Sequence, residues 1–172
     1  MNATVPGALR AAPSFHADPA AAYIAANSFD KPTLVISRDR VAAQYDALHK
    51  GLGAAHIHYA VKANPAPEII RLLVKKGSGF DAASRAEIEL CLSQGAKPGN
   101  ISFGNTIKRA SDIAFAHSAG VTLFAADSEA ELDKIAAHAP GARVYLRLIV
   151  ENSMADWPLS RKFGCAGSAL PA

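Results

Sequence analysis

The chain has 172 residues and a mass of 17.9 kDa; half of its residues are apolar and 19% are charged. This composition excludes collagen, low-complexity disorder and a small disulfide-stapled fold. The net charge of +3 is small and the basic residues are scattered, so we expect no nucleic-acid partner. A bilayer span takes about 18 apolar residues and no run reaches that length, so we expect no membrane segment.

The cysteines and the first residues bear on the compartment. Cys91 and Cys165 stand 74 positions apart without a CxxC pair, which favours a reducing environment over a disulfide framework. Proline and charged residues interrupt the alanine-rich stretch 1–26, so we expect no signal-peptide core there. The sequence therefore predicts a cytoplasmic protein.

Three parts are predicted along the chain. Residues 1–28 form an extension with one helix, which starts near Asp18 and Pro19 because a cap residue there precedes a first-turn proline. Residues 29–165 form the folded domain and residues 166–172 a tail. β-rich runs, separated by stretches of helical spacing, start at six positions: Thr33, His56, Ser78, Asn100, Val121 and Val144.

Helix signals occur between these runs. Residues 68–76 place isoleucine, leucine and valine on one apolar stripe, with an acid early and a lysine late. Ser84 with Glu87, and Ser128 with Glu131, each match the capping box that opens a helix. The chain therefore alternates strand and helix.

The last five β-rich runs are evenly spaced. Their centres are 22, 21, 21 and 23 residues apart, which predicts parallel strands joined by crossover helices, an α/β fold. An open, doubly wound five-stranded sheet would be complete at this length. A closed (β/α)8 barrel of the TIM type needs about 176 residues from the first of these strands. This chain would therefore end about three strands before the barrel closes. The first turn, residues 62–67, has no glycine to admit a phosphate, which slightly favours the partial barrel.

Three charged residues stand at predicted strand ends, where chemistry gathers in a parallel α/β fold. Lys62 directly follows an apolar run, and partial desolvation there would free its amine to attack a carbonyl. From position alone, a lysine that simply extends into water is the more common case. Asp81 ends the next strand and can hold that amine or a cationic group, or serve only as a turn residue. Arg147 lies inside an apolar strand and so implies an anionic partner or an exposed edge.

Other polar residues near these ends carry less information. Glu87 is already explained by its capping box, and Asn105 follows the third strand end, where amides are common in turns. His56 and His58 share one strand face, but no third ligand stands at a recognisable spacing, so we expect no metal site.

Five short segments follow one another along the chain: YAVKAN at 59–64, FDAAS at 80–84, FGNTIK at 103–108, LRL at 146–148 and SRKFG at 160–164. In this order they resemble the motifs of the pyridoxal-phosphate-dependent decarboxylases with an alanine-racemase-like barrel (fold type III). The segment 80–84, with Glu87 three positions on, is similar to the ornithine decarboxylase branch in particular, whereas diaminopimelate decarboxylases carry a glycine-rich version. The resemblance runs from about residue 29 to residue 165.

The resemblance implies a function and a set of roles. Lys62 is then the catalytic lysine that binds pyridoxal phosphate covalently, Asp81 and Arg147 line the cofactor pocket, and Glu87 and Asn105 stand near its edge. The implied reaction is decarboxylation of ornithine or lysine to a diamine, as in polyamine biosynthesis. The family also implies a homodimer, and it places the run at Thr33 in a second, β domain ahead of the barrel.

The family's later elements are not found in this sequence. These are the cofactor-stacking histidine, the glycine-rich phosphate site, the acid that faces the pyridine nitrogen and the C-terminal domain. We therefore interpret residues 29–165 as an incomplete barrel domain, part of a natural fragment or a frameshifted product that is inactive alone, with an unpaired edge at 144–150. Alternatives are a non-catalytic partner of an intact subunit, a diaminopimelate or arginine decarboxylase relative, and a single-domain barrel that carries the cofactor without a decarboxylase domain.

Overall fold

The computed structural model describes residues 19–149 and 163–167. The chain forms two compact units, Met1–Arg40 and Val41–Ala172. The first unit contains α1 (Pro19–Ala26), so a helix forms in the predicted region. Among the described residues no helix is long and apolar enough to cross a membrane.

The strand expected at 33–37 is wrong. These residues have no regular structure, none of the described residues pairs with them, and Leu34 is 82% exposed. Apolar and β-branched residues favour a strand only where a neighbouring strand supplies hydrogen bonds and a packed face. Residues 33–37 have the sequence pattern of a strand, but no strand among the described residues pairs with them.

The second unit alternates strands and helices after α2 (Arg38–Leu52), which begins in the first unit. In chain order its other elements are β1 (His58–Ala60), the 3-10 turn η2 (Val61–Ala63), α3 (Pro67–Lys75), β2 (Gly79–Ala82), α4 (Arg85–Ser93), η3 (Pro98–Asn100), β3 (Ile101–Phe103), α5 (Ala110–Ser118), β4 (Leu123–Ala126), α6 (Glu129–His138) and β5 (Arg143–Leu146). Each of the five evenly spaced runs therefore forms a strand, as predicted.

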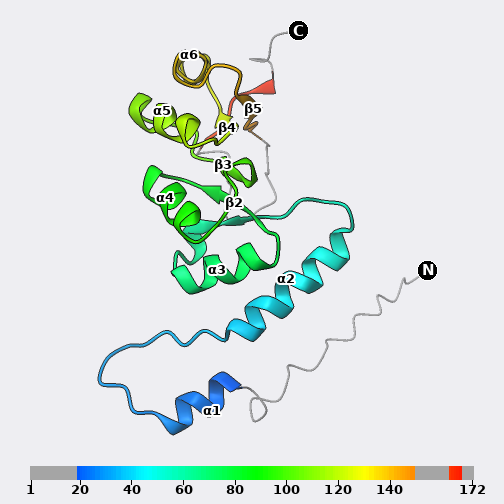
Figure 1. Ribbon diagram of the computed structural model, residues 1–172, viewed down its shortest axis with the longest axis vertical. Coiled ribbons are helices and arrows are strands. Elements are labelled where there is room, and N and C mark those ends of the chain that lie inside the picture. Colours follow the sequence, from blue (N-terminus) through cyan, green and yellow to red (C-terminus); the bar gives the residue numbers. More distant parts are fainter. Residues whose placement is uncertain (1–18, 150–162, 168–172) are drawn as a thin grey trace, which may run out of the picture. The chain divides into compact units, whose positions relative to one another are not determined.

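The five strands form one parallel sheet in the order β1-β2-β3-β4-β5. A doubly wound sheet reverses its strand order at a switch point, whereas a barrel adds each strand beside the previous one. The observed order therefore excludes the doubly wound alternative and confirms the partial barrel. Helices α3 to α6 follow one another along one side of the sheet (Figure 1).

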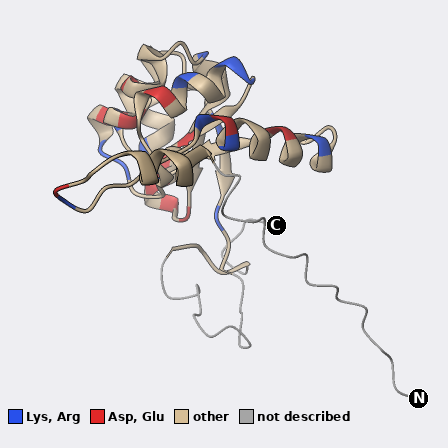
Figure 2. Cartoon of the chain, turned by 90° about the horizontal axis from the view of Figure 1, so that it is seen from below, with Lys and Arg blue, Asp and Glu red and all other residues tan. Residues whose placement is uncertain are grey.

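The core lies between the sheet and these helices. Alternate strand residues, represented by Phe80, Phe103 and Phe124, are fully buried and pack against apolar helix residues such as Ile88 and Ile113. The residues between them on the strands project to the opposite face. Of the charged residues that the structure describes, only Lys108 and Glu131 are buried. Acidic and basic positions are interspersed over the described chain (Figure 2).

One predicted capping box forms and the other does not. Ser84 Oγ accepts from the amide of Glu87 at 3.3 Å, and the Glu87 carboxylate accepts from the amide of Ala83 at 2.6 Å. Ser128 precedes α6 without a side-chain cap bond to the described helix residues. Glu131 is instead buried against Lys108, so a tertiary ion pair displaces the local cap.

The edge beyond β5 is partly paired, which corrects the expected open edge. Residues 163–167 return to the sheet, where Leu148 and Cys165 form a parallel bridge. The amide of Cys165 donates to the carbonyl of Arg147, and that of Ile149 to the carbonyl of Cys165, both at 2.9 Å. The amide of Gly164 also donates to Asp127 Oδ2 at 3.0 Å. Sheet pairing therefore continues past β5.

Candidate functional site

Lys62 lies in the turn that leaves β1. Val61 anchors the turn because its side chain is fully buried in the core, while Lys62 itself is exposed. The Tyr59 hydroxyl donates to the carbonyl of Asn64 at 3.3 Å, and Asn64 Oδ1 accepts from the amide of Ala66 at 3.0 Å. Burial raises the pKa of Tyr59, and its bond to Asn64 lowers it in part. These contacts hold a rigid backbone beneath an exposed lysine side chain.

Asp81 occupies the neighbouring strand beside this turn. The register pairs it with Ala60, two residues before Lys62. Its strand neighbours Phe80 and Ala82 are buried towards the helices, so its carboxylate projects from the other face. Ser102, its partner on β3, donates a hydrogen bond to Asp81 Oδ1 at 2.8 Å.

Tyr145 joins this pair from β5. Its hydroxyl lies close enough to Asp81 and Ser102 for both side chains to act on its pKa, and the Arg147 charge acts on it as well. Burial raises the pKa of Tyr145, as does the Asp81 charge, while the Arg147 charge lowers it. The structure therefore brings Asp81 and Arg147, predicted from separate motifs, to one polar cluster around Tyr145.

The closeness of Tyr145 to Asp81 also indicates that the sheet is curled. β5 is three strands away from β2 in the sheet order. In a flat sheet three strand spacings span about 14 Å, farther than a tyrosine and an aspartate reach together. The sheet must therefore curl around the face that carries this cluster, as the wall of a barrel does.

Arg147 follows β5 at the same end of the sheet. Its amide donates to the carbonyl of Ala126 at 2.9 Å, and its guanidinium carbon lies 5.5 Å from the centre of the Phe163 ring. A cation over an aromatic face is attracted to the ring. Phe163 belongs to the SRKFG motif, of which residues 160–162 lie outside the described residues.

Glu87 and Asn105 are both engaged locally. The Glu87 carboxylate accepts from the backbone at the start of α4, and the Asn105 side-chain amide donates to the carbonyl of Ile107 at 2.8 Å. They stand just past β2 and β3 respectively, at the carboxyl ends of these strands. Their predicted place near the edge of a pocket stays a prediction.

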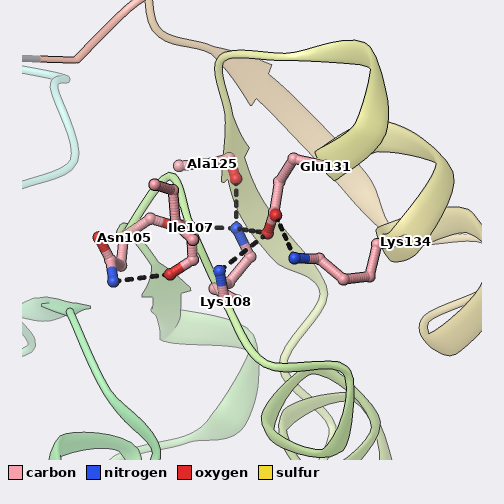
Figure 3. A network of polar contacts seen from close by, with 6 residues as sticks. All are labelled: Asn105, Ile107, Lys108, Ala125, Glu131 and Lys134. Carbon is pink, nitrogen blue, oxygen red and sulfur yellow. Dashed lines mark hydrogen bonds and ion pairs between the residues drawn. The ribbon is translucent and has the colours of Figure 1, made fainter.

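A buried ion pair supports the loop that carries Asn105 (Figure 3). Lys108 Nζ lies 2.8 Å from Glu131 Oε1, and the two side chains are 0% and 4% exposed. The same ammonium donates to the carbonyls of Ala125 and Asn105 at 2.6 and 2.8 Å, and Lys134 lies 2.6 Å from the second Glu131 oxygen. Burial lowers the pKa of Lys108, and the bond to Glu131 raises it again in part.

Sequence reasoning missed several of these residues. Ser102 could have been found from strand alternation, because equal spacing places it opposite Asp81. Tyr145 carried no local signal, and the motifs that contain Lys108 and Glu131 gave no sign of their pairing, since each contact depends on how distant elements come together.

The histidines lie away from this cluster. His58 starts β1 and, with His56, Tyr45 and His49, lines a hollow of about 210 Å³ at the amino ends of the strands. No group of three or more side chains that could hold a metal occurs among the described residues.

A sheet of consecutive parallel strands, with a lysine at the end of the first and a carboxylate at the end of the second, defines an α/β-barrel protein whose site lies at the carboxyl ends of its strands. The family model described as the pyridoxal-binding domain of the pyridoxal-dependent decarboxylases matches residues 38–172. The chain belongs to this family.

Curated relatives agree with this assignment. The chain is 39% identical to the lysine/ornithine decarboxylase of Selenomonas ruminantium over 133 residues, 77% of this chain and 34% of that protein. It is also 39% identical to the chloroplastic ornithine decarboxylase of Nicotiana glauca over 142 residues, 82% of this chain and 32% of that protein. The chain thus spans about a third of the length of these two relatives.

Solved structures share the fold. The lysine decarboxylase from Selenomonas ruminantium has a TM-score of 0.76 and 36% identity, covering 87% of this chain and 39% of that one. The arginine decarboxylase of Paramecium bursaria Chlorella virus has a TM-score of 0.72 and 31% identity, covering 76% of this chain and 36% of that one. Pyridoxal phosphate is the cofactor of this family.

Proposed function

We propose that this chain is the lysine-bearing part of a decarboxylase that converts ornithine or lysine to a diamine, the chemistry of polyamine biosynthesis. The observation that carries the proposal is the position of Lys62: an exposed amine on a rigid turn, beside the strand that bears Asp81. An amine that attacks an aldehyde must be both accessible and fixed, and this turn provides both.

The residues present fit pyridoxal phosphate by their chemistry. An amine, a carboxylate and a guanidinium stand at the carboxyl ends of β1, β2 and β5, and the sheet curls around the face that carries Asp81. When bound, the cofactor supplies an electron sink for the cleavage of the carboxylate from the substrate. Lys62 is proposed to hold it covalently and Asp81 and Arg147 to line its pocket, with Glu87 and Asn105 at the edge.

Trapping at Lys62 tests this assignment. We expect borohydride to fix pyridoxal phosphate on Lys62 of the 172-residue chain, detected as a mass shift of the peptide that contains this residue. The Lys62→Ala variant is expected to lose the label and the Lys97→Ala variant, which removes another exposed lysine, to keep it. Labelling spread evenly over surface lysines would refute a dedicated site.

The substrate is proposed from the relatives. The Selenomonas ruminantium relative is a lysine/ornithine decarboxylase, and the Vibrio vulnificus lysine/ornithine decarboxylase was crystallised with putrescine, with a TM-score of 0.72 to this chain. The Chlorella virus neighbour is an arginine decarboxylase, which makes arginine the third substrate to test. Chromatography of putrescine, cadaverine and agmatine after incubation of each amino acid with the protein separates the three.

The 172-residue chain alone is proposed to be inactive. Tyr145 is 39% exposed, so the face that carries the polar cluster is open to water. Decarboxylation relies on a site that excludes water, where electrostatic interactions are strong. We further propose a cytoplasmic homodimer as the working form. Rapid diamine release by the monomeric chain would contradict this part of the proposal.

One relative favours a second candidate. The chain is 38% identical over 115 residues to antizyme inhibitor 2 of Xenopus laevis, whose name is that of an inhibitor and not of a decarboxylase. A non-catalytic role, in which this chain pairs with an intact decarboxylase subunit, is therefore the alternative. Mixing the purified chain with a full-length decarboxylase and measuring the mass of the complex separates the two: a stable heterodimer without labelling at Lys62 favours the alternative.

A further inference from the structure

The orientation of Asp81 is set by three neighbours, two of which, Ser102 and Tyr145, lie outside the five motifs. Ser102 is 3% exposed and donates to Asp81 Oδ1 at 2.8 Å. Tyr145 approaches from β5, where its hydroxyl is close enough to both side chains for them to act on its pKa. Because a carboxylate accepts and does not donate, the bond from Ser102 favours one rotamer of Asp81, and the Tyr145 hydroxyl stands beside it.

Gly104 provides the space in which this carboxylate lies. A Cβ atom at this position would lie 2.0 Å from Asp81 Oδ1 and 2.6 Å from its Cγ. The amide of Gly104 donates to the carbonyl of Ala82 at 2.8 Å, so the backbone cannot move aside without the loss of this bond.

The backbone conformation does not explain this glycine. Gly104 is not among the described glycines with a positive φ, so alanine could adopt its backbone angles without strain. The three atoms nearest to a Cβ at this position all belong to the carboxylate of Asp81, which therefore explains why the residue is a glycine.

We propose that Ser102, Gly104 and Tyr145 are positioning residues for Asp81, which hold its carboxylate in one orientation on the curled face of the sheet. As far as the cofactor is concerned, this inference rests on the proposed function. The role of the three residues is to act through Asp81: the Ser102 hydroxyl bonds the carboxylate, the Tyr145 hydroxyl stands beside it and Gly104 makes room for it.

The pKa of Tyr145, measured by tyrosine titration, tests the position of Asp81 without any cofactor. The groups that face the Tyr145 hydroxyl are Asp81 on β2, Ser102 on β3 and Arg147 beyond β5. The absorbance of phenolate is followed against pH in the full chain, and the Tyr145→Phe variant identifies which transition belongs to Tyr145. Because the Asp81 charge helps to raise this pKa, Asp81→Asn is expected to move the transition down, towards the ordinary value of 10.0.

Gly104→Ala is the decisive variant. It is expected to displace Asp81 and lower the pKa of Tyr145 in the direction that Asp81→Asn lowers it. Gly99→Ala is the matched control, because a Cβ atom at Gly99 would meet no described atom within 4 Å, and Gly99 is likewise not among the described glycines with a positive φ. A Gly104→Ala chain that is folded by circular dichroism and titrates like wild type would overturn the proposal.

Cofactor binding gives the second readout. Ser102→Ala removes one hydrogen bond to the carboxylate and is expected to weaken pyridoxal phosphate binding about tenfold, measured by fluorescence titration. Unchanged affinity in both Ser102→Ala and Gly104→Ala would refute the link to the cofactor. If the wild-type chain takes no label at Lys62, the proposed function fails, while the tyrosine titration still decides the positioning of Asp81.

Discussion

Removal of the charge of Glu131 is expected to be among the most costly single changes in the described core. Glu131→Gln keeps the shape of the side chain but leaves the ammonium of Lys108, which is 0% exposed, without the carboxylate that bonds it; of the acids that act on this ammonium, only Asp127 remains. Two carbonyls, those of Ala125 and Asn105, remain as acceptors. A buried charge that loses its partner costs about 3 to 5 kcal/mol, so we expect at least about 3 kcal/mol of lost unfolding free energy near neutral pH.

The pH dependence of this loss is the sharper test. The variant can relieve the unpaired charge by releasing the Lys108 proton, and each pH unit below the ordinary value of 10.5 makes that release more costly by about 1.4 kcal/mol. The loss of unfolding free energy near neutral pH is therefore at most about 5 kcal/mol, and this loss becomes smaller as the pH rises towards 10.5. Urea unfolding of the 172-residue chain at several pH values, followed by circular dichroism, measures it.

Lys134→Met is the control for this prediction. Lys134 is 30% exposed and bonds the outer Glu131 oxygen, so its removal is expected to cost about 1 kcal/mol or less. A loss in Glu131→Gln that is equally small, or one that stays constant as the pH rises, would show that the pair is not desolvated as the geometry indicates.

Two further predictions concern a cap and a thiol. Ser84→Ala removes a formed cap and is expected to lower the free energy of unfolding, measured in urea, by about 1 kcal/mol. Ser128→Ala is expected to cost much less, because Ser128 makes no side-chain cap bond to the described helix residues. Equal losses in the two variants would contradict the assignment of the cap. Burial raises the pKa of Cys91 from 9.0 to about 12, so the unfolded state loses the thiol proton first and stability falls as the pH rises above 9. Cys91→Ala is expected to flatten that fall in urea titrations at pH 8 to 10, and an unchanged slope would refute the burial argument.

The fold could be predicted from spacing because a parallel strand–helix repeat leaves a periodic signal. Even spacing located all five strands, but it could not choose between a doubly wound sheet and a barrel, since both use the same local units. Strand order settles that choice, and order is a property of long-range pairing. The run at 33–37 failed for the same reason: its local pattern favours a strand, but pairing decides whether a strand forms.

The candidate site divides along the same line. Lys62 and Asp81 could be placed from sequence because each directly follows or ends a predicted strand. The cap at Ser128 was predicted from a local motif and lost to a buried partner, Lys108, 23 positions away from Glu131. Local motifs are reliable here only where no distant charge competes for the same carboxylate.

The curl of the sheet connects the fold to the proposed chemistry. Asp81 and Tyr145 belong to strands that a flat sheet would hold apart, and their contact exists because consecutive parallel strands bend around the face that carries them. The same bend brings the ends of β1, β2 and β5 towards one axis. In the proposed site, the side chains of Lys62, Asp81 and Arg147 at these ends would bind the same small molecule. A change that flattened the sheet would separate these groups without altering any of them, which is why the orientation of Asp81, read through the titration of Tyr145, reports on the geometry of the whole site.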